Sequence, residues 1–191
     1  VSDLSRAEEI LAGLAGRRAA FQLIFDEDGR LLGAAVSEKK QEAVFLACEG
    51  FLTETYLTTK LAETIHSMEQ AVTIDLKPQL TRLPLSMQDA ALFDAAIAAY
   101  LLNPLKGSYE AEDLARDYLD WMVPSKSELL GKMPLHQAAV EQREDFLRYV
   151  CRMAAIAYQA LPVLEERLRA EDMIKLFTEV EMPLVFTLRH M

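Results

Sequence analysis

Short apolar runs separated by polar turns fill the first third of the chain, a pattern typical of β-strands. The segment 19–25, AAFQLIF, has the length and composition of a strand, and segments 31–37 and 43–47 follow as candidate second and third strands. The tetrad DEDG at 26–29 joins the first two, because its acids can bond their own backbone and its glycine can adopt a positive φ. Three short strands in succession predict an antiparallel meander.

A helical period replaces this pattern in much of the remaining chain. Apolar residues recur every three to four positions, which predicts helices at 4–14, 51–66, 94–102, 109–119, 136–169 and 171–182. Pro162 is expected to bend or break the long helix, and the last helix is expected to end near Pro183. Between the helices, 71–75 predicts a short buried strand, 77–83 a turn with a brief helix, and 123–134 a solvated loop. One sheet combined with these helices predicts an α/β or α+β fold.

The size and charge of the chain limit the functions that it can have. Its 191 residues suit one domain, and 51% of them are apolar, so the chain is expected to fold. Its 30 acidic side chains outnumber the 20 basic ones, which gives a formal charge of −10. A protein that grips a phosphate backbone on its own normally carries a basic face, so tight independent DNA binding is not expected.

The cysteines and the hydropathy of the chain indicate a cytoplasmic protein. Cys48 and Cys151 are far apart and lack CxxC spacing, so we expect two buried thiols in a reducing compartment rather than a disulfide or a metal pair. No apolar run approaches the roughly 20 residues of a membrane helix, and the acidic, amphipathic start is unlike a signal peptide. Because the first residue is not methionine, we expect a fragment of a longer chain.

Common motifs for metal, phosphate and acyl chemistry are missing from the sequence. His66, His136 and His190 share no HxxxH or HExxH spacing, so a zinc site is not expected. The chain has neither a glycine-rich loop before a helix nor a GxSxG elbow.

Two weak signals for nucleic-acid binding have simpler interpretations. Trp121 could stack on a base, but we expect it to pack in a half-buried position. A local basic strip is possible, although a solvated face is the simpler reading of its members, Arg17, Arg18, Arg143, Arg148 and Arg152.

Three segments resemble one known family. The stretch 93–119, with Asp94 as a helix N-cap followed by YLLNP, resembles the middle of the 3′–5′ exonuclease domain of bacterial DNA polymerase I. The segment 71–80, AVTIDLKPQL, is similar to its second exonuclease motif, and 176–191 resembles the lead into the polymerase domain. The resemblance implies a ribonuclease-H-like α/β fold, with a mixed sheet of about five strands flanked by helices. It also implies an exonuclease-like domain over 1–170 and the start of the connection to an absent polymerase domain over 171–191.

The resemblance further implies that the catalytic site has been lost. Active members hold two divalent metals, about 4 Å apart, with four carboxylates. The corresponding positions here are Gln22 and Ile24 on the first strand, Gln79 in the second motif and Met153 in the third, while the family's tyrosine is retained as Tyr149. Amides and a thioether cannot hold Mg²⁺ against its hydration shell, so we expect no catalytic, metal or cofactor residues and a closed, packed pocket. Magnesium would act only in the absent polymerase domain.

Three functional hypotheses follow. The first is an inactive, structural exonuclease-like domain of a DNA-directed DNA polymerase I in replication and repair, which contacts the polymerase domain of its own chain, binds DNA weakly or not at all, and does not engage membranes. The second is an active metal-dependent 3′–5′ exonuclease with relocated ligands, drawn from the acids Asp26, Glu27, Asp28, Asp75, Glu141, Glu144 and Asp145. The third is a free-standing interaction module. We favour the first and interpret the acids of DEDG as a hairpin turn.

Overall fold

The computed structural model describes residues 1–88 and 91–189, and its centre is a five-stranded mixed sheet with the order β3-β2-β1-β4-β5. Neighbours among β1, β2 and β3 run antiparallel, whereas β4 is parallel to both β1 and β5. The strands are β1 Arg18–Phe25, β2 Leu31–Lys39, β3 Glu42–Ala47, β4 Gln70–Thr73 and β5 Ala91–Asp94. The predicted meander and the predicted ribonuclease-H-like fold class are therefore confirmed.

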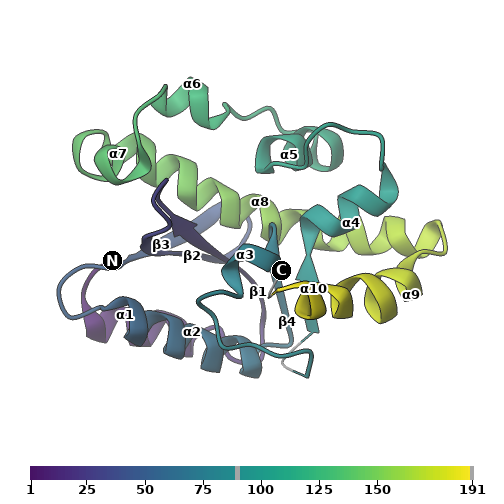
Figure 1. The fold of residues 1–191 in the computed structure, drawn as a ribbon, viewed down its shortest axis with the longest axis horizontal. Helices are drawn as coiled ribbons and strands as arrows, with labels where there is room; N and C mark the ends of the chain where they lie inside the picture. Colours follow the sequence, from purple (N-terminus) through teal and green to yellow (C-terminus); the bar gives the residue numbers. More distant parts are fainter. Residues whose placement is uncertain (89–90, 190–191) are drawn as a thin grey trace.

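Helices cover both faces of the sheet (Figure 1). On one face lie α1 (Leu4–Ala12) and α2 (Glu54–Ser67). The long helix α8 crosses the other face and contacts β1, β2 and β3. The shorter helices on that side are α4 Ala95–Leu102, α5 Ala111–Leu119, α6 Lys126–Leu130 and α7 Leu135–Glu141, next to α8 Arg143–Ala170. None of the described helices is long and apolar enough to cross a membrane.

The C-terminal segment packs on the β5 side of the same body. Its elements are α9 Ile174–Leu176, the π-helical turn η1 Phe177–Glu181 and α10 Met182–Leu188. The ring of Phe177 lies 4.6 Å from that of Phe93 on β5. The predicted end near Pro183 is wrong, because the helix continues to Leu188. Pro183 is the second residue of α10, after the π turn, where a missing N–H is tolerated.

Other sequence predictions need correction as well. The long helix is interrupted at Gln142, whose φ of −128° and ψ of 51° lie outside the helical region, and it runs unbroken through Pro162. The predicted loop 123–134 contains α6, which begins with a capping box between Ser125 and Glu128. Strand β5 was not predicted, because its four residues, which end at Asp94, lie in an apolar stretch with a helical period.

Candidate functional site

The four positions that the resemblance assigns are buried or half-buried where β1, α3 (Leu76–Gln79) and α8 converge. Gln22, on β1, is 5% exposed, and Gln79, at the end of α3, is 1% exposed. Ile24 on β1 is 4% exposed, and Met153 on α8 is half-buried. Hydrogen bonds connect the two glutamines, while Ile24 and Met153 share an apolar cluster.

Gln22 ties the end of β4 to β1 through both ends of its amide. Its Oε1 accepts hydrogen bonds from the Thr73 hydroxyl and from the backbone N–H of Ile74, each at 3.0 Å. Its Nε2 donates to the carbonyl of Ile74 at 2.9 Å. The reversed amide would place a donor against the N–H of Ile74, so only this orientation satisfies the neighbours.

Gln79 completes the network from the opposite side. Its Oε1 accepts from the backbone N–H of Leu23 at 2.9 Å, and its Nε2 donates to the Thr73 hydroxyl at 2.8 Å and to the carbonyl of Asp75 at 3.0 Å. The Thr73 hydroxyl thus accepts from Gln79 and donates to Gln22. We call these two glutamines with Thr73 the amide network.

The amide network leaves little capacity for a metal ion. Both Gln22 lone pairs accept protein donors, and the Gln79 oxygen is directed at the backbone of β1. Hard divalent cations favour carboxylates, and these neutral oxygens are already engaged. The chemistry of the donors therefore does not fit a two-metal site at these positions.

An apolar cluster fills the space on the α8 side. Its buried members are Ile24, Phe45, Leu130, Leu135, Ala138, Phe146 and Val150. Met153 and Tyr149 pack against them from α8. The expected closed packing is found here, because Ile24 and Met153 contribute to a core rather than line an open cavity.

Tyr149 shares this apolar environment. Burial, and secondarily the charges of Glu110 and Glu112, raise the pKa of its phenol to about 12. The phenol is therefore neutral at physiological pH and cannot serve as a base there. Its half-buried position agrees with the expected packing role.

Asp94 is a carboxylate that remains buried near the amide network. It accepts hydrogen bonds from Ala96 N at the start of α4, at 2.9 Å, as the predicted N-cap. It also accepts from the backbone N–H groups of Asp75 at 3.1 Å and Leu76 at 2.8 Å. Burial raises the pKa of Asp94 to about 6. This carboxylate joins the second-motif turn to α4, a structural task that occupies its oxygens.

The DEDG acids form the predicted hairpin turn. Asp26 Oδ1 accepts from the backbone N–H of Asp28 at 2.9 Å and from that of Arg30 at 2.8 Å. Glu27 points to α7, where both of its oxygens lie 3.0 Å from the backbone N–H of Leu135. Desolvation opposes ionisation of Glu27, but hydrogen bonds from Leu135, its own backbone and Lys126 outweigh it and lower the pKa.

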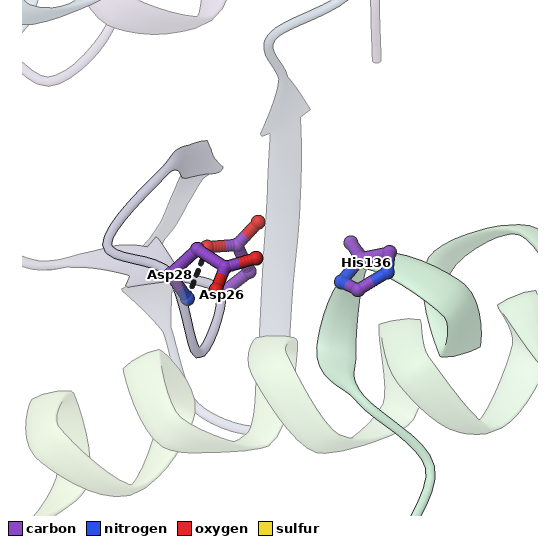
Figure 2. Close-up of side chains that lie close together, drawn as sticks. All are labelled: Asp26, Asp28 and His136. Atoms are coloured by element: carbon purple, nitrogen blue, oxygen red, sulfur yellow. Dashed lines mark hydrogen bonds between the residues drawn. The ribbon is translucent and has the colours of Figure 1, made fainter.

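The same turn forms a possible metal-binding group that the sequence did not reveal. One ligand atom from each of Asp26, Asp28 and His136 lies within 4.8 Å of the other two, and Figure 2 shows the imidazole on α7 facing the turn. We call these three residues the turn cluster. Two carboxylates and an imidazole suit Mn²⁺ or Zn²⁺. Asp26 Oδ1 already serves the turn, so its other oxygen would be the ligand.

The other acids considered as relocated ligands do not join this group. Asp145 and Glu144 bind Arg148 on the surface of α8, and Glu141 accepts from Gln137 within α7. Asp75 lies beside the amide network, and burial raises the pKa of its carboxyl. His66 is not part of a metal-binding group within the described residues, and His190 lies outside them.

Both cysteines are free and half-buried, rather than fully buried as expected. Desolvation raises the pKa of each thiol to about 11, with a further contribution from Glu54 at Cys48. Neither thiol is an activated nucleophile.

Comparison with known proteins identifies a relative. No family model matches the chain. DNA polymerase I of Bacillus subtilis is 35% identical over 102 residues, which are 53% of this chain and 11% of that protein. Over those 102 residues the chain is homologous to DNA polymerase I of Bacillus subtilis. The match spans only about a tenth of the relative's length, so the polymerase reaction of that protein is not thereby assigned to this chain.

Solved structures share the fold of this chain. The catalytic core of RRP6 from Trypanosoma brucei superposes with a TM-score of 0.72 at 13% identity, over 97% of this chain and 51% of that one. A structure titled the POL domain of Pol1 from M. smegmatis, in complex with DNA primer-template and dNTP, gives 0.68 at 17% identity over 98% and 30%. NrnC of Brucella melitensis with bound Mg²⁺ gives 0.65 at 15% identity over 91% and 83%. These likenesses support the exonuclease-like fold, and at such identities nothing beyond it.

Sequence reasoning missed two contacts for the same reason. His136 follows Leu135, whose backbone N–H binds Glu27 of the turn, and Leu135 is 108 residues from Glu27 in the chain. The relay through Thr73 likewise joins residues about 50 positions apart. The polar character of Thr73 in a buried strand was the available signal, since a buried hydroxyl needs a partner.

Proposed function

We propose that this chain is a catalytically inactive 3′–5′ exonuclease-like domain of a bacterial DNA polymerase I, with a structural role in an enzyme of DNA replication and repair. The amide network carries the proposal. A two-metal nuclease needs anionic oxygens free to bind cations, whereas Gln22 and Gln79 present neutral amides engaged with β1 and β4. Ile24 and Met153 supply hydrocarbon and a thioether at the remaining two positions.

The proposed partner is a polymerase domain of the same chain, beyond a connection that begins at 171–191. The homology to DNA polymerase I supports it. Because its net charge is −10, this region would bind DNA with low affinity without the rest of the enzyme. A bacterial polymerase of this kind would work in the cytoplasm, with magnesium bound only in its polymerase domain. Sequencing the gene beyond Met191 tests the partner, because a stop codon there would contradict it.

The inactivity is tested with 5′-labelled single-stranded DNA in the presence of Mg²⁺ or Mn²⁺. We expect no metal-dependent shortening of the strand above a metal-free control. NrnC of Brucella melitensis, assayed in parallel, would verify that the substrate and metals are competent. Metal-dependent digestion by the purified chain would contradict the proposal.

A second candidate function is a metal-dependent exonuclease with relocated ligands. The turn cluster favours it, because the cluster combines two carboxylates with an imidazole. However, the turn cluster is a single set of three ligands. A two-metal mechanism needs carboxylates that are shared between two ions and come from several elements. If digestion occurs, Asp28→Asn should abolish it, while Glu144→Gln, a matched change of an exposed acid, should not. Digestion by both variants would exclude the turn cluster as its source.

A further inference from the structure

One side of α8 carries a basic groove whose charge is opposite to that of the whole chain. Two adjoining cavities, of about 450 and 640 Å³, share Trp121 and Gln41 as lining residues. The cationic lining residues are Arg18, Lys40, Arg148 and Arg152, and the acidic one is Asp120. We call these two cavities together the α8 groove. Its local excess of cations contrasts with a chain in which acids outnumber bases.

Arg152 carries a buried hydrogen-bond donor that a ligand could satisfy. Its Nη1 atom is buried without a hydrogen-bond partner. Within residues 1–88 and 91–189, no carboxylate forms a salt bridge with Arg152. Burial, and secondarily the charge of Arg148, lower the pKa of its guanidinium, so an anion would stabilise the charged form. A buried donor without a partner is uncommon in folded proteins.

The other arginines that were considered as a basic strip are paired. Arg17 binds Glu38, Arg18 lies 3.8 Å from Glu69, and Arg143 lies 3.5 Å from Glu49. Arg148 is paired with two acids of its own helix. Arg17 and Arg143 fit the solvated-face interpretation, whereas Arg18 and Arg148 also line the groove. Arg152 is the exception among the five, because it has no acidic partner within the described residues.

Trp121 is positioned at the junction of the two cavities. Asp120 ends α5 with a φ of 52°, and the backbone N–H of Trp121 then donates to the carbonyl of Ala115 at 3.0 Å. The indole packs partly on the main core, as the sequence predicted. The part that faces the groove lies beside the arginines of α8 and offers an aromatic surface for a base.

We propose that the α8 groove binds a nucleoside phosphate, with the phosphate on Arg152 and Arg148 and the base on Trp121. Guanidinium groups recognise phosphate oxygens through paired N–H donors, and an indole stacks on nucleobases. Cavities of several hundred Å³ suit one small ligand rather than a long strand. The assignment is independent of the amide network, because none of the groove residues belongs to that network.

The single tryptophan of the chain makes this site directly observable, since intrinsic tryptophan fluorescence reports on Trp121 alone. We expect adenosine triphosphate to change this fluorescence saturably, and adenosine or inorganic triphosphate to bind at least about tenfold more weakly. Arg152→Met should raise the dissociation constant of the nucleotide roughly tenfold or more, because it removes the phosphate donor and keeps an apolar stem. Arg169→Met, on the same helix but outside the groove, should leave it within about twofold.

Several outcomes would overturn the proposal. One is the lack of a saturable fluorescence change at millimolar nucleotide. Another is binding of adenosine, or of inorganic triphosphate, as tight as that of the nucleotide. A third is an equal loss of nucleotide affinity in the two arginine variants. Much tighter binding of a single-stranded oligonucleotide than of the mononucleotide would identify the groove as a path for a strand. A thermal melt of Arg152→Met distinguishes loss of binding from loss of the fold.

Discussion

The amide network and the guanidinium of Arg152 both withdraw polar groups from water, but their surroundings differ. Around Gln22 and Gln79, every side-chain nitrogen and oxygen meets a partner at 3.0 Å or less. Around Arg152, a buried nitrogen meets none. Buried polar groups contribute to a stable fold when satisfied and reduce stability when they are not. We therefore interpret the first region as architectural and the second as part of the ligand site proposed above.

The largest expected effect comes from returning a charge to the amide network. Gln79→Glu replaces a donor by an oxygen that faces the carbonyl of Asp75. We expect a loss of about 3 kcal/mol or more in the free energy of unfolding at neutral pH, because the new carboxylate is buried without a cation. Urea denaturation measures it.

The pH dependence of that variant sharpens the test. The introduced carboxyl should have a raised pKa in the folded state, so its destabilisation should shrink as the pH falls toward 4. Gln88→Glu, a change of an exposed glutamine, serves as the control and should leave the unfolding free energy nearly unchanged. Equal stability of Gln79→Glu and the wild type at neutral pH would mean that a cation or water enters the network.

A smaller loss of unfolding free energy is expected from a change at Asp94, the buried carboxylate near the amide network. Asp94→Ala leaves the N–H groups of Leu76 and Ala96 without their acceptor, which should lower the unfolding free energy by about 2 kcal/mol. Thermal or urea unfolding at pH 7 checks this value. A loss below about 0.5 kcal/mol would show that water replaces the carboxylate at both backbone groups.

The titration of Asp94 gives a second observable. Because burial raises its pKa from the ordinary 3.8 to about 6, the folded state holds this proton more tightly than the unfolded state. The protonation of Asp94 therefore adds stability that is full below pH 4 and is lost as the pH rises to about 6, whereas the hydrogen bonds that the carboxylate accepts remain at pH 7. Asp94→Asn should remove this slope, which unfolding curves at several pH values between 4 and 7 would reveal. An unchanged slope would place the titration elsewhere.

At Arg152 we expect a change in the unfolding free energy of the opposite sign. Arg152→Met removes a buried donor without a partner, so the free energy of unfolding should rise by about 1 kcal/mol in the absence of ligand. The melting temperature should rise by about 2–4 °C for a chain of this size. Arg6→Met, whose side chain is 59% exposed and pairs with the likewise exposed Glu9, should give almost no change. A destabilised Arg152→Met would indicate that the guanidinium serves packing rather than a ligand.

The smallest effect concerns divalent cations. Mg²⁺ or Mn²⁺ should leave the melting temperature unchanged, whereas binding at 100 times the dissociation constant would add about 2.7 kcal/mol. Differential scanning calorimetry with and without the metal tests this. A shift that Asp28→Asn abolishes would show that the turn cluster holds a cation.

The sequence was informative wherever local rules decide the structure. The meander follows from short apolar runs of strand composition and the DEDG turn, and Asp94 caps α4 as expected. The positions of Gln22 and Gln79 came from family resemblance, and their burial is found in the structure. The capping box at Ser125 was also readable, but the prolines and serines around it favoured a loop.

Contacts between distant segments were not predictable in this way. The break at Gln142 depends on how α7 packs against α8, so the proline rule selected the wrong residue. The turn cluster and the α8 groove each unite segments separated by many residues. The periodicity of the sequence does not predict such contacts, because they arise from tertiary packing.

The shared hydroxyl of Thr73 also bears on the evolutionary history of the domain. Each glutamine depends on the other's partner, so exchanging one of them alone disrupts hydrogen bonds on both sides of the relay. Introducing carboxylates at these two positions by successive mutations would therefore pass through a poorly folding intermediate. Under the proposed function, a loss of exonuclease chemistry that is fixed in this form would not readily be reversed.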